Sequence, residues 1–290
     1  MAEAFNDRWW TSPDGLKLHA RDYAGASGPA RLPVICIHGL TRNARDFEAV
    51  APYIAETGRR VLAVSVRGRG LSAWDPRPMN YQPPAYAKDM VALMAASGIA
   101  RAVFVGTSMG GLITMLLAST APRHVAAAAL NDIGPEVSPV GLKRIASYTG
   151  QAAPVESWEE AAAYCQKANG AVFPTYGADD WMNFARRTFT ERDGKPALDY
   201  DPDISAPIRA AGPKALAPNL WPMFRTLAKN RRLMLIRGQT SDLLDVKVAD
   251  KMRKLAPAMA YVEVEGVGHA PMLTEPAARE GLLRFLDGCD

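Results

Sequence analysis

The sequence predicts an α/β protein, and two observations lead to this prediction. Over residues 1–134, short apolar runs alternate with stretches that have the periodicity of helices. The same alternation resumes at residue 231, whereas 135–230 holds helical patterns and no convincing strand. Alternation of this kind is typical of parallel strands joined by helical crossovers. We therefore expect one core, formed by 1–134 and 231–290 and interrupted by a helical lid over 135–230.

Seven runs have the character of strands. In the first run, apolar and polar residues alternate, and this run follows Trp9-Trp10 and a turn at 13–15. The later runs are more continuously apolar, as expected for strands buried on both faces. In chain order the runs are 16–23, 33–37, 60–66, 102–105, 125–130, 232–236 and 261–264.

Helical periodicity lies between these runs. Gly58 ends the first expected helix and Pro122 ends the third. Five prolines (Pro202, Pro207, Pro213, Pro218 and Pro222) punctuate the end of the lid. The expected helices are 44–56, 85–96, 112–121, 140–148, 157–168, 246–255 and 276–286.

Composition excludes several classes of protein. With 290 residues, 48% of them hydrophobic and 22% charged, the chain is neither disordered nor fibrous. The net charge of +4 is the small difference between 34 basic and 30 acidic residues. Basic residues cluster only at 59–60, 67–69 and 229–232, which we interpret as solvated faces. We expect no nucleic-acid partner.

Cysteine usage and the N-terminal sequence indicate a compartment. Cys36, Cys165 and Cys289 are too few and too widely spaced for a disulfide framework, which indicates a reducing environment. The first residues lack the pattern of a signal peptide, and no run of about 18 apolar residues is present. We expect a cytoplasmic protein without a membrane span.

The strongest chemical signal is Gly106-Thr-Ser-Met-Gly110, a G-x-S-x-G motif between an expected strand and an expected helix. The glycines permit a sharp turn that lifts the Ser108 hydroxyl above the edge of the sheet. The alternative is a glycine-rich helix start with an ordinary N-cap serine. The strand and helix on either side favour Ser108 as a nucleophile.

A serine hydroxyl needs a base within hydrogen-bond reach. His269 follows the last expected strand and so lies at the same sheet edge as Ser108, which makes it our candidate. His19 and His124 are interpreted as solvated or structural, and His38 as a packing and hydrogen-bonding residue.

The base needs an acid to orient it. We favour Asp242, which follows the strand 232–236, over Asp132, which follows the strand 125–130. Chain order allows both. Asp245 is a weaker third candidate, because it is placed to cap the next helix.

Acyl transfer also needs donors for the developing oxyanion. The backbone N–H groups of Leu40, after the strand 33–37, and Met109, after the nucleophile, are the expected pair.

Together, these motifs and the loop Arg67-Gly-Arg-Gly-Leu-Ser72 resemble the α/β-hydrolase family over essentially the whole chain. The family often has Asp where this chain has Ser65, in a loop that is structural. The resemblance implies a mostly parallel, eight-stranded sheet with helices on both faces and an inserted helical lid. It also favours carboxylesterases, lactonases and C–C bond hydrolases over dehalogenases, epoxide hydrolases and cofactor-free haloperoxidases. The sequence also resembles bacterial esterases that act on polyesters.

The lid is rich in aromatic residues, with 11 of the 23 in the chain. Such rings can line an apolar pocket, although for any single ring packing is the simpler role. We expect pocket residues among Trp158, Trp181, Trp221 and Phe224. A C–C hydrolase would need a cation for a charged dienoate, and Arg186, Arg187 or Arg209 could supply it.

The sequence therefore predicts a serine hydrolase that cleaves small to medium apolar esters through an acyl-enzyme, without metal or organic cofactor. Polyesters are included among its candidate substrates. Lactone or C–C bond hydrolysis by the same triad, and a slow-turnover ligand sensor on the same fold, remain alternatives. The expected partner is a small-molecule ester, and a homodimer is left open.

Overall fold

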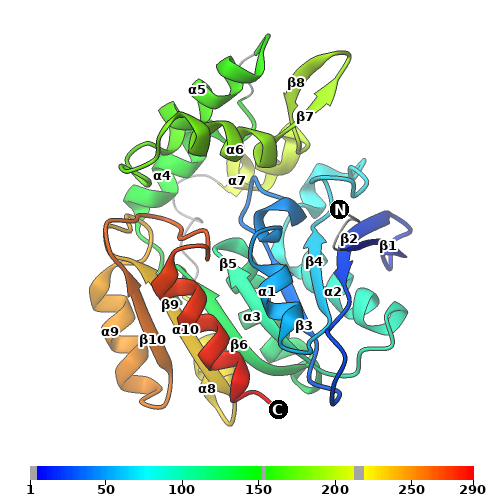
Figure 1. The fold of residues 1–290 in the computed structure, drawn as a ribbon, viewed down its shortest axis with the longest axis vertical. Coiled ribbons are helices and arrows are strands. Elements are labelled where there is room, and N and C mark those ends of the chain that lie inside the picture. Colours follow the sequence, from blue (N-terminus) through cyan, green and yellow to red (C-terminus); the bar gives the residue numbers. More distant parts are fainter. Residues whose placement is uncertain (1–4, 152–154, 212–218) are drawn as a thin grey trace.

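The computed structural model describes residues 5–151, 155–211 and 219–290. Its centre is an eight-stranded sheet in the order β1-β2-β4-β3-β5-β6-β9-β10 (Figure 1). Strand β2 is antiparallel to both neighbours, and every other adjacent pair from β4 to β10 is parallel. This confirms the mostly parallel sheet. The strands are β1 (Asn6–Thr11), β2 (Lys17–Tyr23), β3 (Val34–Ile37), β4 (Val61–Ser65), β5 (Ala102–Thr107), β6 (Val125–Asn131), β9 (Arg232–Gly238) and β10 (Ala260–Val264).

Helices cover both faces of the sheet because alternate strand residues point to opposite sides. In β3, Ile35 and Ile37 join the core under α2 (Pro83–Ala96), α3 (Met109–Thr120), α8 (Trp221–Ala228) and α9 (Val246–Leu255). Val34 and Cys36 join the core under α1 (Ala51–Glu56) and α10 (Pro276–Asp287). The helix expected over 44–56 is a 3₁₀ turn, Ala44–Phe47, followed by α1. Further 3₁₀ turns span Pro78–Asn80, Pro122–His124 and Pro202–Ser205.

The inserted segment lies above the sheet in Figure 1 and consists of α4 (Pro139–Tyr148), α5 (Trp158–Asn169), α6 (Ala178–Thr188), a hairpin of β7 (Phe189–Arg192) and β8 (Lys195–Leu198), and α7 (Ala206–Ala211). The expectation of no strand in this segment is wrong. Asp193 and Gly194, with φ of 50° and 76°, form the hairpin turn, and Asp-Gly is a known signal for such a turn.

Helix α8 differs from the rest of the segment because it packs against α3 in the core. The chain therefore returns to the core at α8, before the lid boundary that we expected at residue 230. Pro213 and Pro218 lie outside the described residues.

The carboxyl ends of four parallel strands meet at one edge. Ile37 of β3 pairs with Gly106 of β5, and Thr107 of β5 pairs with Asn131 of β6, which pairs with Ile236 of β9. The loops that follow these strands are therefore neighbours.

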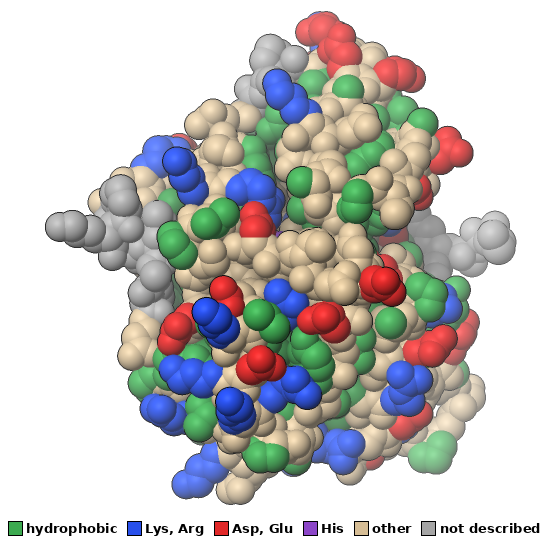
Figure 2. All heavy atoms as spheres, turned by 90° about the vertical axis from the view of Figure 1, so that its left-hand side faces the viewer, with side chains coloured by type: hydrophobic (Ala, Val, Ile, Leu, Met, Phe, Trp, Pro, Cys, Tyr) green, Lys and Arg blue, Asp and Glu red, His purple; other side chains and the backbone are tan. Residues whose placement is uncertain are grey.

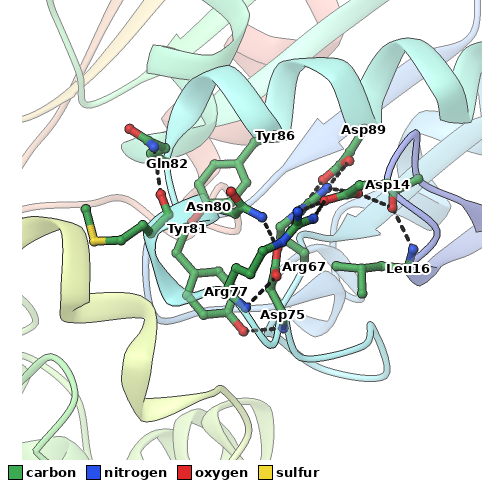
Figure 3. Close-up of polar contacts among 12 residues, drawn as sticks. Asp14, Leu16, Arg67, Asp75, Arg77, Asn80, Tyr81, Gln82, Tyr86 and Asp89 are labelled. Atoms are coloured by element: carbon green, nitrogen blue, oxygen red, sulfur yellow. Dashed lines mark hydrogen bonds and ion pairs between the residues drawn. The ribbon is translucent and has the colours of Figure 1, made fainter.

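Several arginines of the first two basic clusters are buried, so interpreting these residues as solvated faces is wrong, whereas Lys229 and Arg232 of the third cluster are exposed. Arg59, Arg67 and Arg69 are at most 2% exposed. Arg67 donates to Asp14, Asp75 and Asp89 at 2.6–2.9 Å (Figure 3). This network fixes the loop that follows β4. On the surface drawn in Figure 2, basic and acidic side chains are interspersed over the lower half.

No helix among the described residues is both long enough and apolar enough to cross a membrane.

Candidate active site

The turn between β5 and α3 holds Ser108 in a conformation that few residues adopt. Its φ of 51° and ψ of −114° lie outside the helical and extended regions. A Cβ at Gly110 would lie 2.0 Å from the Ile37 carbonyl oxygen, and one at Gly106 would lie 2.5 Å from the backbone of Gly110. Both positions therefore require glycine, and the close crossing of helix and strand presents Ser108 at the edge of the sheet.

Three side chains form a continuous chain of hydrogen bonds at this edge. His269 Nε2 lies 2.9 Å from Ser108 Oγ, and His269 Nδ1 lies 2.7 Å from Asp132 Oδ2. Because a carboxylate only accepts, Nδ1 carries the proton and Nε2 is left as an acceptor facing the serine hydroxyl. This is the arrangement in which an imidazole can take the proton of a nucleophile.

Asp132 is held by more than His269. The side chain is fully buried, its Oδ1 accepts from the Gly238 N–H at 2.8 Å, and its Oδ2 accepts from the Ser241 hydroxyl at 2.6 Å. A Cβ at Gly238 would lie 2.3 Å from the Gly268 carbonyl oxygen, so glycine lets the loop before His269 approach. The end of β9 and the loop after it thus supply the two hydrogen bonds that hold Asp132.

Our preference for Asp242 as the acid is contradicted by the structure. Its carboxylate accepts from Arg144 of α4 at 2.6 and 2.8 Å, and this hydrogen bonding lowers the pKa of Asp242. The physical reason is register: Asp132 directly follows Asn131, which pairs with the residue before Ser108, whereas Asp242 lies one strand further away. Asp245 caps α9 by accepting from the Lys247 N–H, as its alternative role predicted.

The loop after β3 brings a backbone N–H to the same place. Within the described part of the chain, the N–H groups of Leu40 and Met109 have no protein acceptor. His38 Nδ1 lies 2.6 Å from the Gly39 carbonyl oxygen, which belongs to the same peptide group as the Leu40 N–H. The Val66 N–H donates to His38 Nε2 at 3.0 Å, so Nδ1 is the donor. His38 thereby fixes this peptide, as its predicted hydrogen-bonding role requires.

Burial keeps His38 neutral, since it lowers the pKa of this imidazole to about 4. Behind the same loop, the buried Arg69 donates from Nε to the Leu40 carbonyl oxygen at 3.0 Å. His19 is also structural: it is buried, and its Nε2 lies 2.8 Å from Asp7. The remaining histidine, His124, directly precedes the amino end of β6, and its Nδ1 lies 2.8 Å from the Ala100 carbonyl oxygen.

A pocket of about 100 Å³ lies between the sheet edge and the lid, and Ser108, His269 and Leu40 line it. Its volume is well below the range of typical ligand pockets, so it favours short substrate groups. Five aromatic residues of its wall come from the inserted segment, as expected, but they are Tyr148, Tyr164, Phe173, Phe184 and Tyr200, and a sixth, Phe47, comes from the turn Ala44–Phe47 of the core.

None of the four aromatics that we expected in the pocket lines it. Trp158 lies under the guanidinium of Arg186 at 3.7 Å, and Trp181 packs behind Phe173 and Phe184. Trp221 and Phe224 belong to α8 and contact each other edge to face.

Those rings pack within the lid or the core. Sequence could not distinguish them from the pocket residues, because aromatic density does not reveal which face of a helix a ring occupies.

The arginines suggested for a charged substrate also lie elsewhere, since Arg186, Arg187 and Arg209 are absent from the pocket wall. Arg42, which we did not single out, lines the pocket instead. Cys165 also lines it, and burial raises its pKa to about 11, so it is no thiolate nucleophile near neutral pH. Over the described ranges, no three His, Cys, Asp or Glu side chains are grouped as metal ligands would be.

Comparison with known proteins agrees with this geometry. Residues 33–276 match the alpha/beta hydrolase fold family. The 3-hydroxybutyrate-oligomer hydrolase of Cupriavidus necator is 35% identical over 274 residues, which cover 92% of each chain. The 2-(acetamidomethylene)succinate hydrolase of Mesorhizobium japonicum is 25% identical over 244 residues, 84% of this chain and 82% of the relative.

Among solved structures, an alpha/beta hydrolase from Novosphingobium aromaticivorans DSM 12444 superimposes with a TM-score of 0.91 and 46% identity, covering 99% of both chains. The match of the family to most of the chain, together with these relatives, identifies the fold without reference to any single residue. The chain belongs to the α/β-hydrolase fold family.

Proposed function

We propose that this protein is a serine hydrolase of carboxylic esters, with Ser108, His269 and Asp132 as its catalytic triad. The observation that carries the proposal is the unbroken chain of hydrogen bonds from Ser108 Oγ through His269 to a fully buried carboxylate. A family that includes ester hydrolases, such as the esterase YbfF of Escherichia coli, supports it further.

The reaction follows from these positions. Ser108 Oγ attacks the ester carbonyl carbon while His269 Nε2 takes its proton, and Asp132 stabilises the resulting imidazolium. The Leu40 and Met109 N–H groups donate to the oxyanion, and each such donor contributes about 3 kcal/mol to transition-state stabilisation. His269 then returns the proton to the leaving alcohol. Water, activated by the same imidazole, hydrolyses the acyl-enzyme.

The substrate we propose is a short linear ester of a hydroxy acid. The relative from Cupriavidus necator, whose name states that it hydrolyses 3-hydroxybutyrate oligomers, aligns with nearly the whole chain, and the small pocket suits short groups. Lactone and C–C bond hydrolysis and a sensor role remain alternatives that a substrate panel separates. The cytoplasmic location and the homodimer remain predictions.

The test is hydrolysis of p-nitrophenyl acetate and of 3-hydroxybutyrate dimers by the protein and by Ser108→Ala. We expect the substitution to lower kcat by about 10⁶. Ser119→Ala is the matched control, because Ser119 lies on the same helix α3 and only donates to the Met115 carbonyl oxygen. Ester hydrolysis that survives in Ser108→Ala, or a wild-type protein inactive on every ester, would overturn the proposal.

A further inference from the structure

Arg42 is an unusual component of the pocket wall. Among the described residues that line the pocket, Arg42 and Asp46 are the only Arg, Lys, Asp or Glu side chains. Both are largely buried, with 12% and 10% of their side chains exposed. A buried ion pair contributes little to stability compared with apolar residues of the same size. Its presence inside a substrate pocket therefore calls for a role in recognition.

The guanidinium of Arg42 is held on three sides. Its Nε lies 2.8 and 3.0 Å from the two carboxylate oxygens of Asp46, and its Nη2 lies 2.5 Å from Oδ1. Its Nη1 donates to the hydroxyl of Thr188, which donates its own hydrogen to the Phe184 carbonyl oxygen. The Phe184 ring covers one face, 4.1 Å from the guanidinium carbon. The group is thus oriented before any ligand arrives.

This orientation leaves hydrogen-bond donors unused. A guanidinium has five N–H groups, two of them on each terminal nitrogen. In the described part of the chain, Nη1 and Nη2 have one acceptor each, Thr188 and Asp46. One N–H on each terminal nitrogen therefore remains for a ligand in the pocket. Two neighbouring N–H groups of this kind match the two oxygens of a carboxylate.

Arg42 is also close to the nucleophile. A Cβ built on Gly39 would lie 3.7 Å from Arg42 Cγ and 3.8 Å from Ser108 Cβ, so the two side chains flank the same small space. Both residues line the same pocket, so a ligand bound there can contact both side chains.

We infer that the substrate carries a carboxylate close to the scissile ester, and that Arg42 binds this carboxylate and so determines specificity. The inference rests on the proposed ester hydrolysis and names its substrate class: short esters of hydroxy acids with a free carboxyl end. Because Asp46 offsets the charge of Arg42, recognition depends on directed hydrogen bonds, and the selectivity it gives is moderate.

The test compares two substrates that differ in one group: the linear dimer of 3-hydroxybutyrate and the same dimer with its terminal carboxylate converted to a primary amide. We expect the wild-type protein to hydrolyse the acid with a kcat/KM about 10- to 100-fold above that of the amide. In the double variant Arg42→Gln/Asp46→Asn, which leaves no unpaired buried charge, this ratio falls to about 1.

Two further variants sharpen the result. Asp46→Asn alone removes the competing carboxylate, so the ratio of acid to amide rises. Arg45→Gln is the matched control, since Arg45 lies in the 3₁₀ turn that contains Asp46 but pairs with Asp199 and does not line the pocket; its ratio stays at the wild-type value.

A double variant that keeps the wild-type ratio, or a wild-type protein that hydrolyses acid and amide equally, would overturn the inference. Hydrolysis of p-nitrophenyl acetate that depends on Ser108 leaves the proposed function standing in that case. If no ester is hydrolysed at all, the proposed function fails and takes the inference with it.

Discussion

Two aspartates, Asp132 and Asp242, are candidates for the acid that orients His269. Substituting each in turn shows which of them has this role. In Asp132→Asn, the amide oxygen can still accept from the Gly238 N–H, but the NH₂ group then faces His269 Nδ1 and the Ser241 hydroxyl. An NH₂ group donates, so His269 must carry its proton on Nε2 and can no longer accept from Ser108. By analogy with other triads, this wrong tautomer lowers kcat by about 10⁴, or roughly 5.5 kcal/mol in the activation barrier.

Asp242→Asn changes a different interaction. The pair between Asp242 and Arg144 has about a quarter of each side chain exposed, and such pairs contribute at most about 1 kcal/mol. We expect kcat within about threefold of the wild-type value and, because α4 is loosened, an altered KM. The assay is steady-state hydrolysis of p-nitrophenyl acetate, with urea unfolding of each variant as the control for folding. A loss of about 10⁴ in kcat for Asp242→Asn, with Asp132→Asn still active, would refute the reasoning.

Two further predictions concern the supports of the site. Burial raises the pKa of Asp89 to about 6, above its ordinary value of 3.8, so the folded protein binds the extra proton and loses stability as the pH rises between these values. Urea unfolding should therefore show the stability of Asp89→Asn rising relative to that of the wild type between pH 4 and pH 7, and a difference independent of pH would contradict this. His38→Phe removes the hydrogen bond that fixes the Gly39–Leu40 peptide, and we expect kcat to fall by about 10- to 100-fold with little change in KM. An unchanged kcat in a variant that unfolds at the wild-type urea concentration would show that Gly39 and Leu40 need no such support.

Local sequence was sufficient where the chemistry lies in one short segment. Ser108 could be found because the strand, the two glycines and the helix that constrain it are all within a few residues of it. His269 was placed at the same edge because it lies in the loop after the last strand, and the carboxyl ends of parallel strands meet at one edge. The parallel strands followed from the alternation of apolar runs and helices, whereas the number of eight strands followed from the resemblance to the α/β-hydrolase family.

Sequence was insufficient where the answer depends on which strands are neighbours. Both Asp132 and Asp242 follow strands, and only the pairing of β5 with β6 places Asp132 beside Ser108. The available signal was the position of Asp132 directly after β6, which favours it over an aspartate several residues beyond a strand. The loop that carries Asp242 also carries Ser241, which binds Asp132 together with Gly238 at the end of β9.

The pocket wall was the least predictable part. Its residues come from lid helices that approach the sheet edge at angles no periodicity records, so Phe173 and Phe184 line the pocket whereas Trp158 and Trp181 do not. Arg42 was overlooked because it lies in a polar turn, where an arginine is ordinarily exposed.

The central claim is that Ser108 is the activated nucleophile of an ester hydrolase. The measurement that tests it most directly is the intact mass of the protein after treatment with a fluorophosphonate, followed by mapping of the labelled peptide. We expect a single adduct on Ser108 that is absent from Ser108→Ala and that forms much more slowly in Asp132→Asn. An unlabelled wild-type protein, or an adduct that persists in Ser108→Ala, would contradict it.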